Sequence, residues 1–135
     1  MNNKSKKILA EISAGELLDK LTILEIKRYK TENSVKKKLI KEEYKALKEV
    51  SDKIVDWNHN KEVQRLFGDL RHINEKLWAI EDKIRIHEKE KNFDKEFIEL
   101  ARSVYISNDE RSKIKAKINT LLDSNIKEIK DYTDY

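Results

Sequence analysis

Residues 63–84 read VQRLFGDLRHINEKLWAIEDKI, and apolar side chains recur in this stretch every three or four positions. The apolar row consists of Val63, Leu66, Leu70, Ile73, Leu77, Ile80 and Ile84. Near-heptad spacing over such a length is typical of a helix that packs lengthwise against other helices. The sequence therefore predicts one long helix over about residues 61–90, around which the rest of the chain is arranged.

Two helices are expected before this stretch. Ser13 and Glu16 have the spacing of a capping box, which predicts a first helix over residues 14–31. One side of that helix carries the apolar residues Leu17, Leu18, Leu21, Leu24 and Tyr29. A second helix is predicted over about residues 35–57, where the apolar residues are Ile40, Tyr44, Leu47, Val50, Ile54 and Trp57.

One helix is expected after it. Asp94 is a suitable N-cap, which predicts a fourth helix over residues 94–123. Ser107 and Glu110 could form a second capping box that breaks this helix near Ile106, but the apolar phase is the same on both sides, so a continuous helix is preferred. The fold class is thus all-α, an antiparallel bundle of four helices whose first helix is the shortest.

Composition agrees with this class. The 135 residues contain no proline, two glycines and 41% charged residues, a mixture rich in helix formers and of a size typical of one domain. Because cysteine is absent, disulfides and thiolate metal sites are excluded, and we expect a cytoplasmic protein. Residues 1–10 are expected to be a mobile basic arm and residues 124–135 a polar tail.

The apolar runs are too short to cross or anchor in a membrane. A net charge of +4 arises from 30 basic and 26 acidic residues that are mixed along the chain. The lysine runs at 36–38 and at 113, 115 and 117 are flanked by acids, so they predict a solvated face and no nucleic-acid partner. The near-heptad helix and the wide apolar arcs favour a homodimer.

Polar residues interrupt the apolar stripes of three of the four helices. They are Glu25 and Arg28 in the first, Asn74, Glu81 and Arg85 in the third, and Asn108 and Arg111 in the fourth. Burial of such groups is costly unless they meet one another or a ligand. We therefore expect one polar cluster shared by these three helices.

Three stretches, 11–27 (EISAGELLDKLTILEIK), 74–85 and 97–111, resemble a family of short bacterial and phage proteins that is itself a domain of unknown function. The resemblance implies no reaction. It extends the cluster to the following candidate set: Asp19, Thr22, Glu25, Arg28, Asn74, Trp78, Glu81, Arg85, Asn108, Asp109 and Arg111.

Two functions are compatible with this cluster. Two acids and three arginines leave one positive charge, which an anion such as a phosphate, carboxylate or sugar nucleotide could neutralise, with Glu25 or Glu81 as general acid or base. In the preferred alternative Asp19 or Asp109 supplies the missing charge, the network fixes helix packing, and the protein is a non-catalytic interaction or adaptor module without a cofactor.

Other sites are disfavoured. The N–H groups of Ala14 and Gly15 could bind a phosphate at the start of the first helix, but ordinary capping explains them. His59, His72 and His87 fall on separate turns and are expected at the surface or its edge, so no metal site is predicted.

Overall fold

The computed structural model describes residues 6–135. Four helices account for its regular structure: α1 (Ala14–Lys30), α2 (Ser34–Ile54), α3 (Lys61–Glu90) and α4 (Lys95–Leu121). No strand occurs in the described residues. The predicted all-α class with four helices is confirmed, and the bounds of α3 are those expected from its apolar row.

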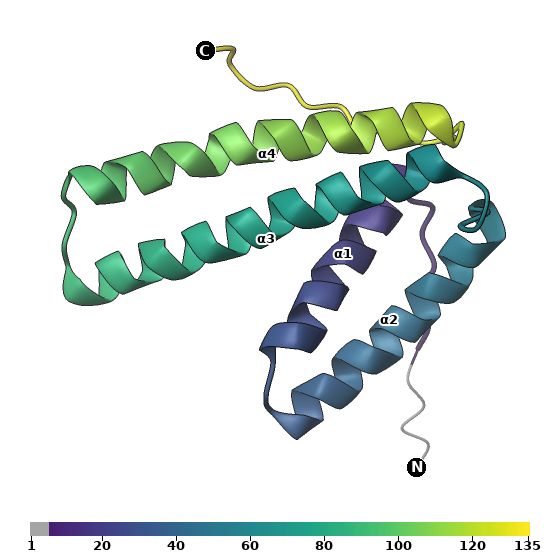
Figure 1. The fold of residues 1–135 in the computed structure, drawn as a ribbon, viewed down its shortest axis with the longest axis horizontal. Helices are drawn as coiled ribbons and strands as arrows, with labels where there is room; N and C mark the ends of the chain where they lie inside the picture. The colour runs from purple at the N-terminus through teal and green to yellow at the C-terminus, as the bar shows by residue number, and fades with distance from the viewer. Residues whose placement is uncertain (1–5) are drawn as a thin grey trace.

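The helices form two pairs that cross. α3 and α4 lie side by side along most of their length, and the pair of α1 and α2 meets them at an angle near one end (Figure 1). α1 contacts each of the other three helices, whereas α2 packs against α1 alone. Because α1 is 17 residues long and α3 is 30, about 25 Å against 45 Å, the second half of α3 extends beyond α1.

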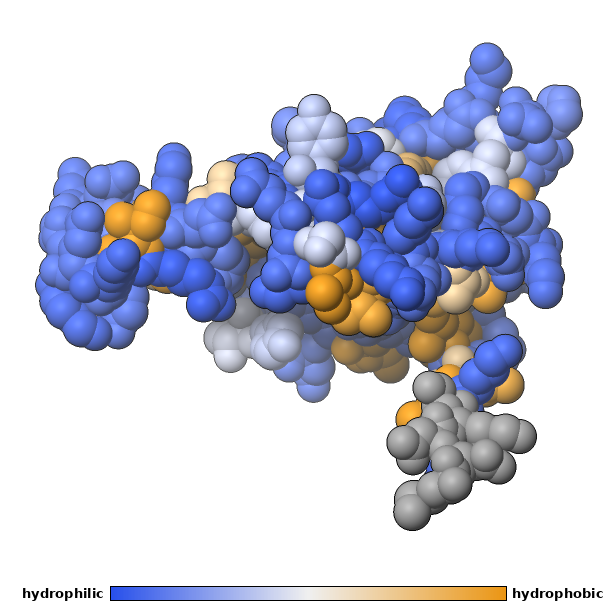
Figure 2. Space-filling model, turned by 90° about the horizontal axis from the view of Figure 1, so that it is seen from below, coloured by the Kyte–Doolittle hydropathy of each residue, from blue (hydrophilic) through white to orange (hydrophobic). Residues whose placement is uncertain are grey.

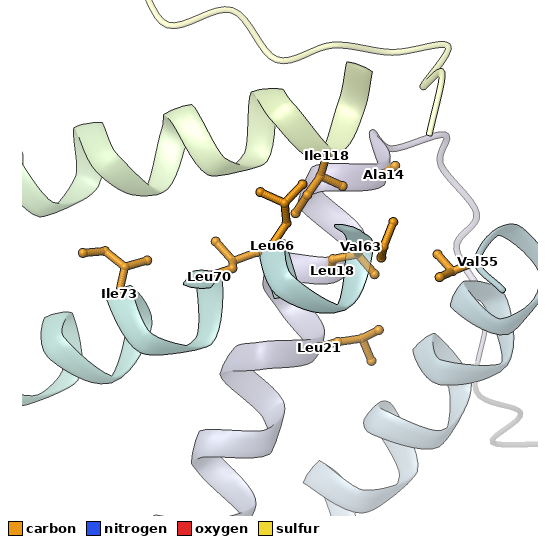
Figure 3. Close-up of a cluster of buried hydrophobic side chains, with 9 residues drawn as sticks. All are labelled: Ala14, Leu18, Leu21, Val55, Val63, Leu66, Leu70, Ile73 and Ile118. Carbon is orange, nitrogen blue, oxygen red and sulfur yellow. The ribbon is translucent and has the colours of Figure 1, made fainter. Parts of the chain in front are cut away.

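The hydrophobic core lies where α1 crosses α3 and α4 (Figure 3). Leucines from the amino-terminal half of α1 meet the first half of α3, and Ile118 of α4 closes the top of the cluster. The members are Ala14, Leu18, Leu21, Val55, Val63, Leu66, Leu70, Ile73 and Ile118. Leu18, Val63, Leu70 and Ile118 are wholly inaccessible to solvent, so this crossing holds the fold together.

The predicted end of α2 was wrong. The helix ends at Ile54 instead of residue 57, and Val55 adopts an extended conformation that turns its side chain into the core. Trp57 therefore lies beyond the helix, with its ring 5.2 Å from the ring of Phe67 in an edge-on contact. The packing of Val55 in the core and of Trp57 against Phe67 of α3 overrides the helical pattern.

The buried side of α2 also differs from the prediction. Val50 and Ile54 are 47% and 46% exposed, whereas Ser51, absent from the predicted row, is fully buried. In α1 the predicted leucines are buried, but Tyr29 is 88% exposed. α2 packs against a single helix, so its apolar arc is wider than the surface available to cover it.

Several local predictions are confirmed. Ser13 Oγ accepts the backbone N–H of Glu16 at 3.1 Å, and Asp94 Oδ1 accepts that of Phe97 at 3.0 Å, so both N-caps are as expected. α4 is continuous through Ser107. α1 ends one residue early, at Lys30, and α4 runs from Lys95 to Leu121 instead of 94–123.

Residues 6–13 and 122–135 lie outside the helices. Of the expected basic arm at 1–10, residues 1–5 lie outside the described part of the chain and residues 6–10 are exposed. The tail at 124–135 returns along α4 (Figure 1), where Lys130 and Tyr135 both contact the carboxylate of Asp109. Within residues 6–135, no helix combines the length and apolar character that crossing a membrane requires.

Candidate functional site

Asp19 is the centre of the polar residues that join α1, α3 and α4. Its side chain is 1% exposed. Asp19 Oδ1 accepts hydrogen bonds from Asn74 Nδ2 at 2.8 Å and from Arg111 Nε at 3.0 Å. The second carboxylate oxygen pairs with Nη2 of the same guanidinium. One carboxylate thus binds a donor from α3 and a two-point partner from α4.

Thr22 and Asn74 complete the buried part of this group. Thr22 Oγ1 donates to the backbone carbonyl of Asp19 at 2.8 Å and accepts from Asn74 Nδ2 at 2.8 Å. The amide nitrogen of Asn74 therefore uses its two hydrogens on two residues of α1. This arrangement fixes the rotation of α3 relative to α1, since a turned helix would leave buried polar atoms unpaired.

Arg111 lies at the border of the group, with a side chain that is 28% exposed. Its Nη1 donates to Asn108 Oδ1 at 3.4 Å, a long contact within α4. The hydrogen bonds to Asp19 raise the pKa of Arg111, so the guanidinium is charged at every accessible pH. Asp19 supplies the negative charge that Arg111 needs.

Lys115, one turn after Arg111, is a member of the site that the sequence prediction missed. The side chain lies 2.7 Å from Glu16, 2.9 Å from Glu128 and 3.8 Å from Asp19. Burial by itself would lower the pKa of Lys115, but its hydrogen bonds to the two glutamates outweigh this effect and the pKa is raised.

The prediction that Lys115 belongs to a solvated lysine face was wrong, because the residue is 8% exposed. One signal was available in the sequence. Lys115 lies four residues after Arg111 and three before the buried Ile118, so it shares their side of α4. Lys113 and Lys117 lie on other sides of the helix and are exposed.

The amino terminus of α1 is capped by α4 and the residues that follow it. The N–H of Gly15 donates to Asn119 Oδ1 at 2.6 Å, and that of Ala14 to Ser124 Oγ at 3.0 Å. A Cβ at Gly15 would lie 2.6 Å from the carbonyl oxygen of Lys115, so only glycine permits this approach. These first-turn donors are satisfied by the protein itself, and capping accounts for them without an anion.

Some predicted site residues lie elsewhere. Glu25 is paired with Arg71 of α3 at 2.8 Å, and Arg28 is exposed with its guanidinium carbon 4.9 Å from the centre of the Tyr44 ring. Asp109 faces the tail on the outer side of α4. The expectation that Arg28 is embedded in the apolar stripe of α1 was therefore wrong.

Glu81 and Arg85 were also expected to be embedded and are exposed. Their charged groups lie 3.7 Å apart, and their side chains are 51% and 79% exposed. The helical pattern predicted burial because an antiparallel bundle would place a further helix, besides α4, along the whole of α3. α1 diverges before this level, so no helix covers the pair.

A groove of about 460 Å³ opens where α1 diverges from α3 and α4. Its apolar walls come from Leu77 and Trp78 of α3, Val104 of α4 and two isoleucines of α1. The full lining is Ile23, Ile26, Asn74, Leu77, Trp78, Glu81, Asp82, Arg85, Val104, Asn108 and Arg111. Six of the eleven predicted site residues thus line one groove next to the Asp19 contacts.

A second cavity, of about 450 Å³, lies between α4 and the tail. Asn108 and Arg111 line both cavities, and Lys115, Glu128 and Lys130 contribute only to the second. Its charged lining is mixed in sign. Arg111 therefore separates an apolar groove on one side from a polar cavity under the tail on the other.

The histidines provide no metal centre in the described residues, where no group of three His, Cys, Asp or Glu side chains could hold an ion. His87 was expected at the surface or its edge but is 8% exposed. Its Nδ1 lies 2.9 Å from the carbonyl oxygen of Asn92. This contact ties the last turn of α3 to the loop before α4, which is a structural role.

No match to this chain was found among the curated proteins or among the solved structures. One family model matches, and it spans residues 8–134. That span includes all four helices, the groove and all of the tail except Tyr135. The chain therefore belongs to the family of unknown function designated DUF6165.

Proposed function

We propose that the protein is a non-catalytic interaction module whose buried polar residues fix the packing of α1, α3 and α4. The observation that carries this proposal is the pairing of the buried charges. Both oxygens of Asp19 are bonded, and Arg111 and Lys115 each have carboxylate partners within the chain. Groups that neutralise one another at rest are suited to holding helices together and poorly suited to general acid–base chemistry.

Exposed apolar side chains support an interaction role. Phe93 and Ile98 at the α3–α4 turn are 51% and 56% exposed, and Val35 and Leu39 on α2 are 68% and 60% exposed. Figure 2 shows a small hydrophobic patch at the end of the molecule where α3 and α4 join and larger ones nearer the middle, all surrounded by hydrophilic surface. Apolar patches of this kind on a highly charged chain are typical of surfaces that contact another protein.

A test of this role uses Trp78, the largest side chain in the groove. Trp78→Asp should abolish the binding of protein partners captured on immobilised protein, while circular dichroism shows an unchanged helix content. Arg65→Asp, on the exposed side of the first half of α3, is the matched control and should retain binding. Equal capture by wild type and both variants would contradict a role for the groove.

The alternative is a small-molecule site, and the size of the groove favours it as a second candidate. A volume of about 460 Å³ lies within the range of small-ligand pockets, and Arg111 and Asn108 in its lining carry hydrogen-bond donors. A thermal-shift screen with phosphates, carboxylates and sugar nucleotides separates the two proposals. The interaction module predicts no shift, whereas a saturable rise in Tm that Trp78→Ala abolishes would establish the ligand site.

A cytoplasmic location is part of this proposal. It rests on the cysteine-free composition, which suits a reducing compartment. Fluorescence microscopy of the tagged protein, compared with fractionation of the untagged chain, tests it.

A further inference from the structure

The chain exposes more surface than a compact protein of its size. Its accessible surface is 10500 Å², whereas a monomer of 16.1 kDa is expected to expose about 7,400 Å². Residues 6–12 and 124–135, which lie outside the helices and are mostly exposed, account for part of the difference. The rest belongs to helices with uncovered sides, and a standard interface needs only about 800 Å² from each partner.

A long uncovered region is the outer half of the α3–α4 hairpin, residues 77–104. Ile80 and His87 are its only buried residues. Its remaining large apolar side chains are half-buried or exposed, namely Leu77, Trp78, Ile84, Ile86, Phe93, Phe97, Ile98, Leu100 and Val104. Two helices alone cannot bury both sides of their apolar rows, so this hairpin lacks the neighbours that a four-helix arrangement would supply.

The exposed charges beside the groove carry both signs. Glu81 and Asp82 are acidic and Arg85 is basic, while Arg111 is already paired with Asp19. A strongly acidic or basic partner would therefore meet like charge as well as opposite charge. A second copy of the same chain brings the same charges, and in the right register it opposes Glu81 to Arg85.

Symmetry defines that register. We propose that the outer α3–α4 hairpin is the interface of a homodimer in which the two α3 helices run in opposite directions across a two-fold axis at the level of Lys83. Residues 81 and 85 lie equally far from this level, so Glu81 of each copy meets Arg85 of the other. This proposal rests on the interaction role proposed above and names the partner.

The same register accounts for the exposed turn between α3 and α4. Asn74 lies as many residues before Lys83 as Asn92 lies after it. The two-fold axis therefore places the turn that follows α3 in one copy at the level of Asn74 in the other. Phe93 then reaches the groove beside Leu77 and Trp78 of the second copy. An isologous interface makes this contact twice, and the aromatic residues would be its main anchors.

Charge reversal tests the interface. Wild-type protein should have a mass of about 32 kDa, twice 16.1 kDa, by light scattering at micromolar concentration. Glu81→Arg or Arg85→Glu alone should weaken the dimer by at least about tenfold, because like charges then face each other across the axis. The double exchange Glu81→Arg/Arg85→Glu should restore it, which a loss of folding would not allow.

The matched control is Glu62→Arg, which reverses a charge in another exposed pair of the same helix and should leave the mass unchanged. Since the chain has no cysteine, single cysteines report proximity. Asp82→Cys, close to the axis, should form a disulfide-linked dimer under mild oxidation, and Asp69→Cys should not.

A wild-type mass of 16.1 kDa throughout this concentration range would overturn the homodimer while leaving the interaction module intact if captured partners depend on Trp78. A dimer that is insensitive to both single reversals would overturn the assigned face.

Discussion

Arg111 of α4 and Asp19 of α1 form a two-point ion pair, although 91 residues of chain separate them in the sequence. Asp19 is 1% exposed, so it would be an uncompensated buried charge without this partner. The pair also marks the border between the hydrophobic core and the groove. It therefore provides the most direct test of whether the polar residues serve packing.

Arg111→Leu is expected to lower the free energy of unfolding by ~2–3 kcal/mol, less than for a fully buried pair because Arg111 is partly exposed. Denaturation in urea measures the change. Arg65→Leu, which breaks an exposed ion pair on α3, should leave it nearly unchanged. An unchanged or increased stability of Arg111→Leu would show that the arginine is held for a ligand instead.

Substitution by alanine should have opposite effects on stability at the two glycines. Gly15→Ala should destabilise the protein by about 1–3 kcal/mol, because the added Cβ would collide with the backbone of Lys115 and push α1 from α4. Gly68→Ala should stabilise it by about 0.5–1 kcal/mol, since nothing lies within 4 Å of the new Cβ and alanine favours the helix. Thermal unfolding of both variants checks the signs, and a neutral Gly15→Ala would argue against the close approach of the two helices.

Removal of two buried hydroxyl groups should also have different effects on stability, because one of them is hydrogen-bonded and the other, within residues 6–135, is not. Ser107 Oγ has no hydrogen-bond partner among the described residues, so Ser107→Ala should be neutral or stabilise the fold by up to about 1 kcal/mol. Thr22→Val removes a hydroxyl that bonds Asn74 and the backbone of Asp19, and should cost about 1–2 kcal/mol. Chemical denaturation of the pair measures this difference, and a larger loss for Ser107→Ala would be inconsistent with an unpaired Ser107.

The contact that holds the tail at Asp109 through Tyr135 should depend on pH. Its hydroxyl donates to Asp109, which raises the pKa of Tyr135 from the ordinary 10.0 to about 12. Because the pKa in the folded protein is above the ordinary value, the contact is complete below pH 10 and is lost as the pH rises through about 12. Site-resolved NMR of the tyrosine rings should show late titration of Tyr135, and Asp109→Asn should return it to about 10. Titration of Tyr135 at its ordinary pH in the wild type would mean that the tail is not held at Asp109.

Local signals account for what the sequence predicted well. Ser13 and Asp94 cap their helices as expected because an N-cap depends on three or four consecutive residues. The apolar row of α3 gave its bounds for a similar reason, since the period of a helix is a local property. Within the candidate site, Asp19, Thr22, Asn74 and Arg111 come together because each lies on a side of its helix that also carries buried apolar residues.

The prediction that Glu81 and Arg85 are buried failed because the exposure of a side chain depends on the neighbouring helix. Glu81 and Arg85 have the same helical phase as Asn74, but Asn74 lies under α1 and they lie beyond it. Lys115 was predicted to be exposed and is buried. The sequence pattern did not show this because Glu16 and Glu128, which neutralise the lysine, are distant in sequence. A periodic pattern identifies the inward side of a helix and carries no information on how far along the helix that side is covered.

The sequence by itself determined the helical class, the number of helices and the polar residues that could meet. Hydrophobic periodicity and capping specify these features because they act over a few turns of one segment. Only the tertiary structure decided that α1 crosses α3 instead of running along it, that Asp19 is the partner of Arg111, and that the outer α3–α4 hairpin is uncovered. Those outcomes depend on side-chain packing at the crossing of three helices, where Gly15 allows the backbones of α1 and α4 to touch.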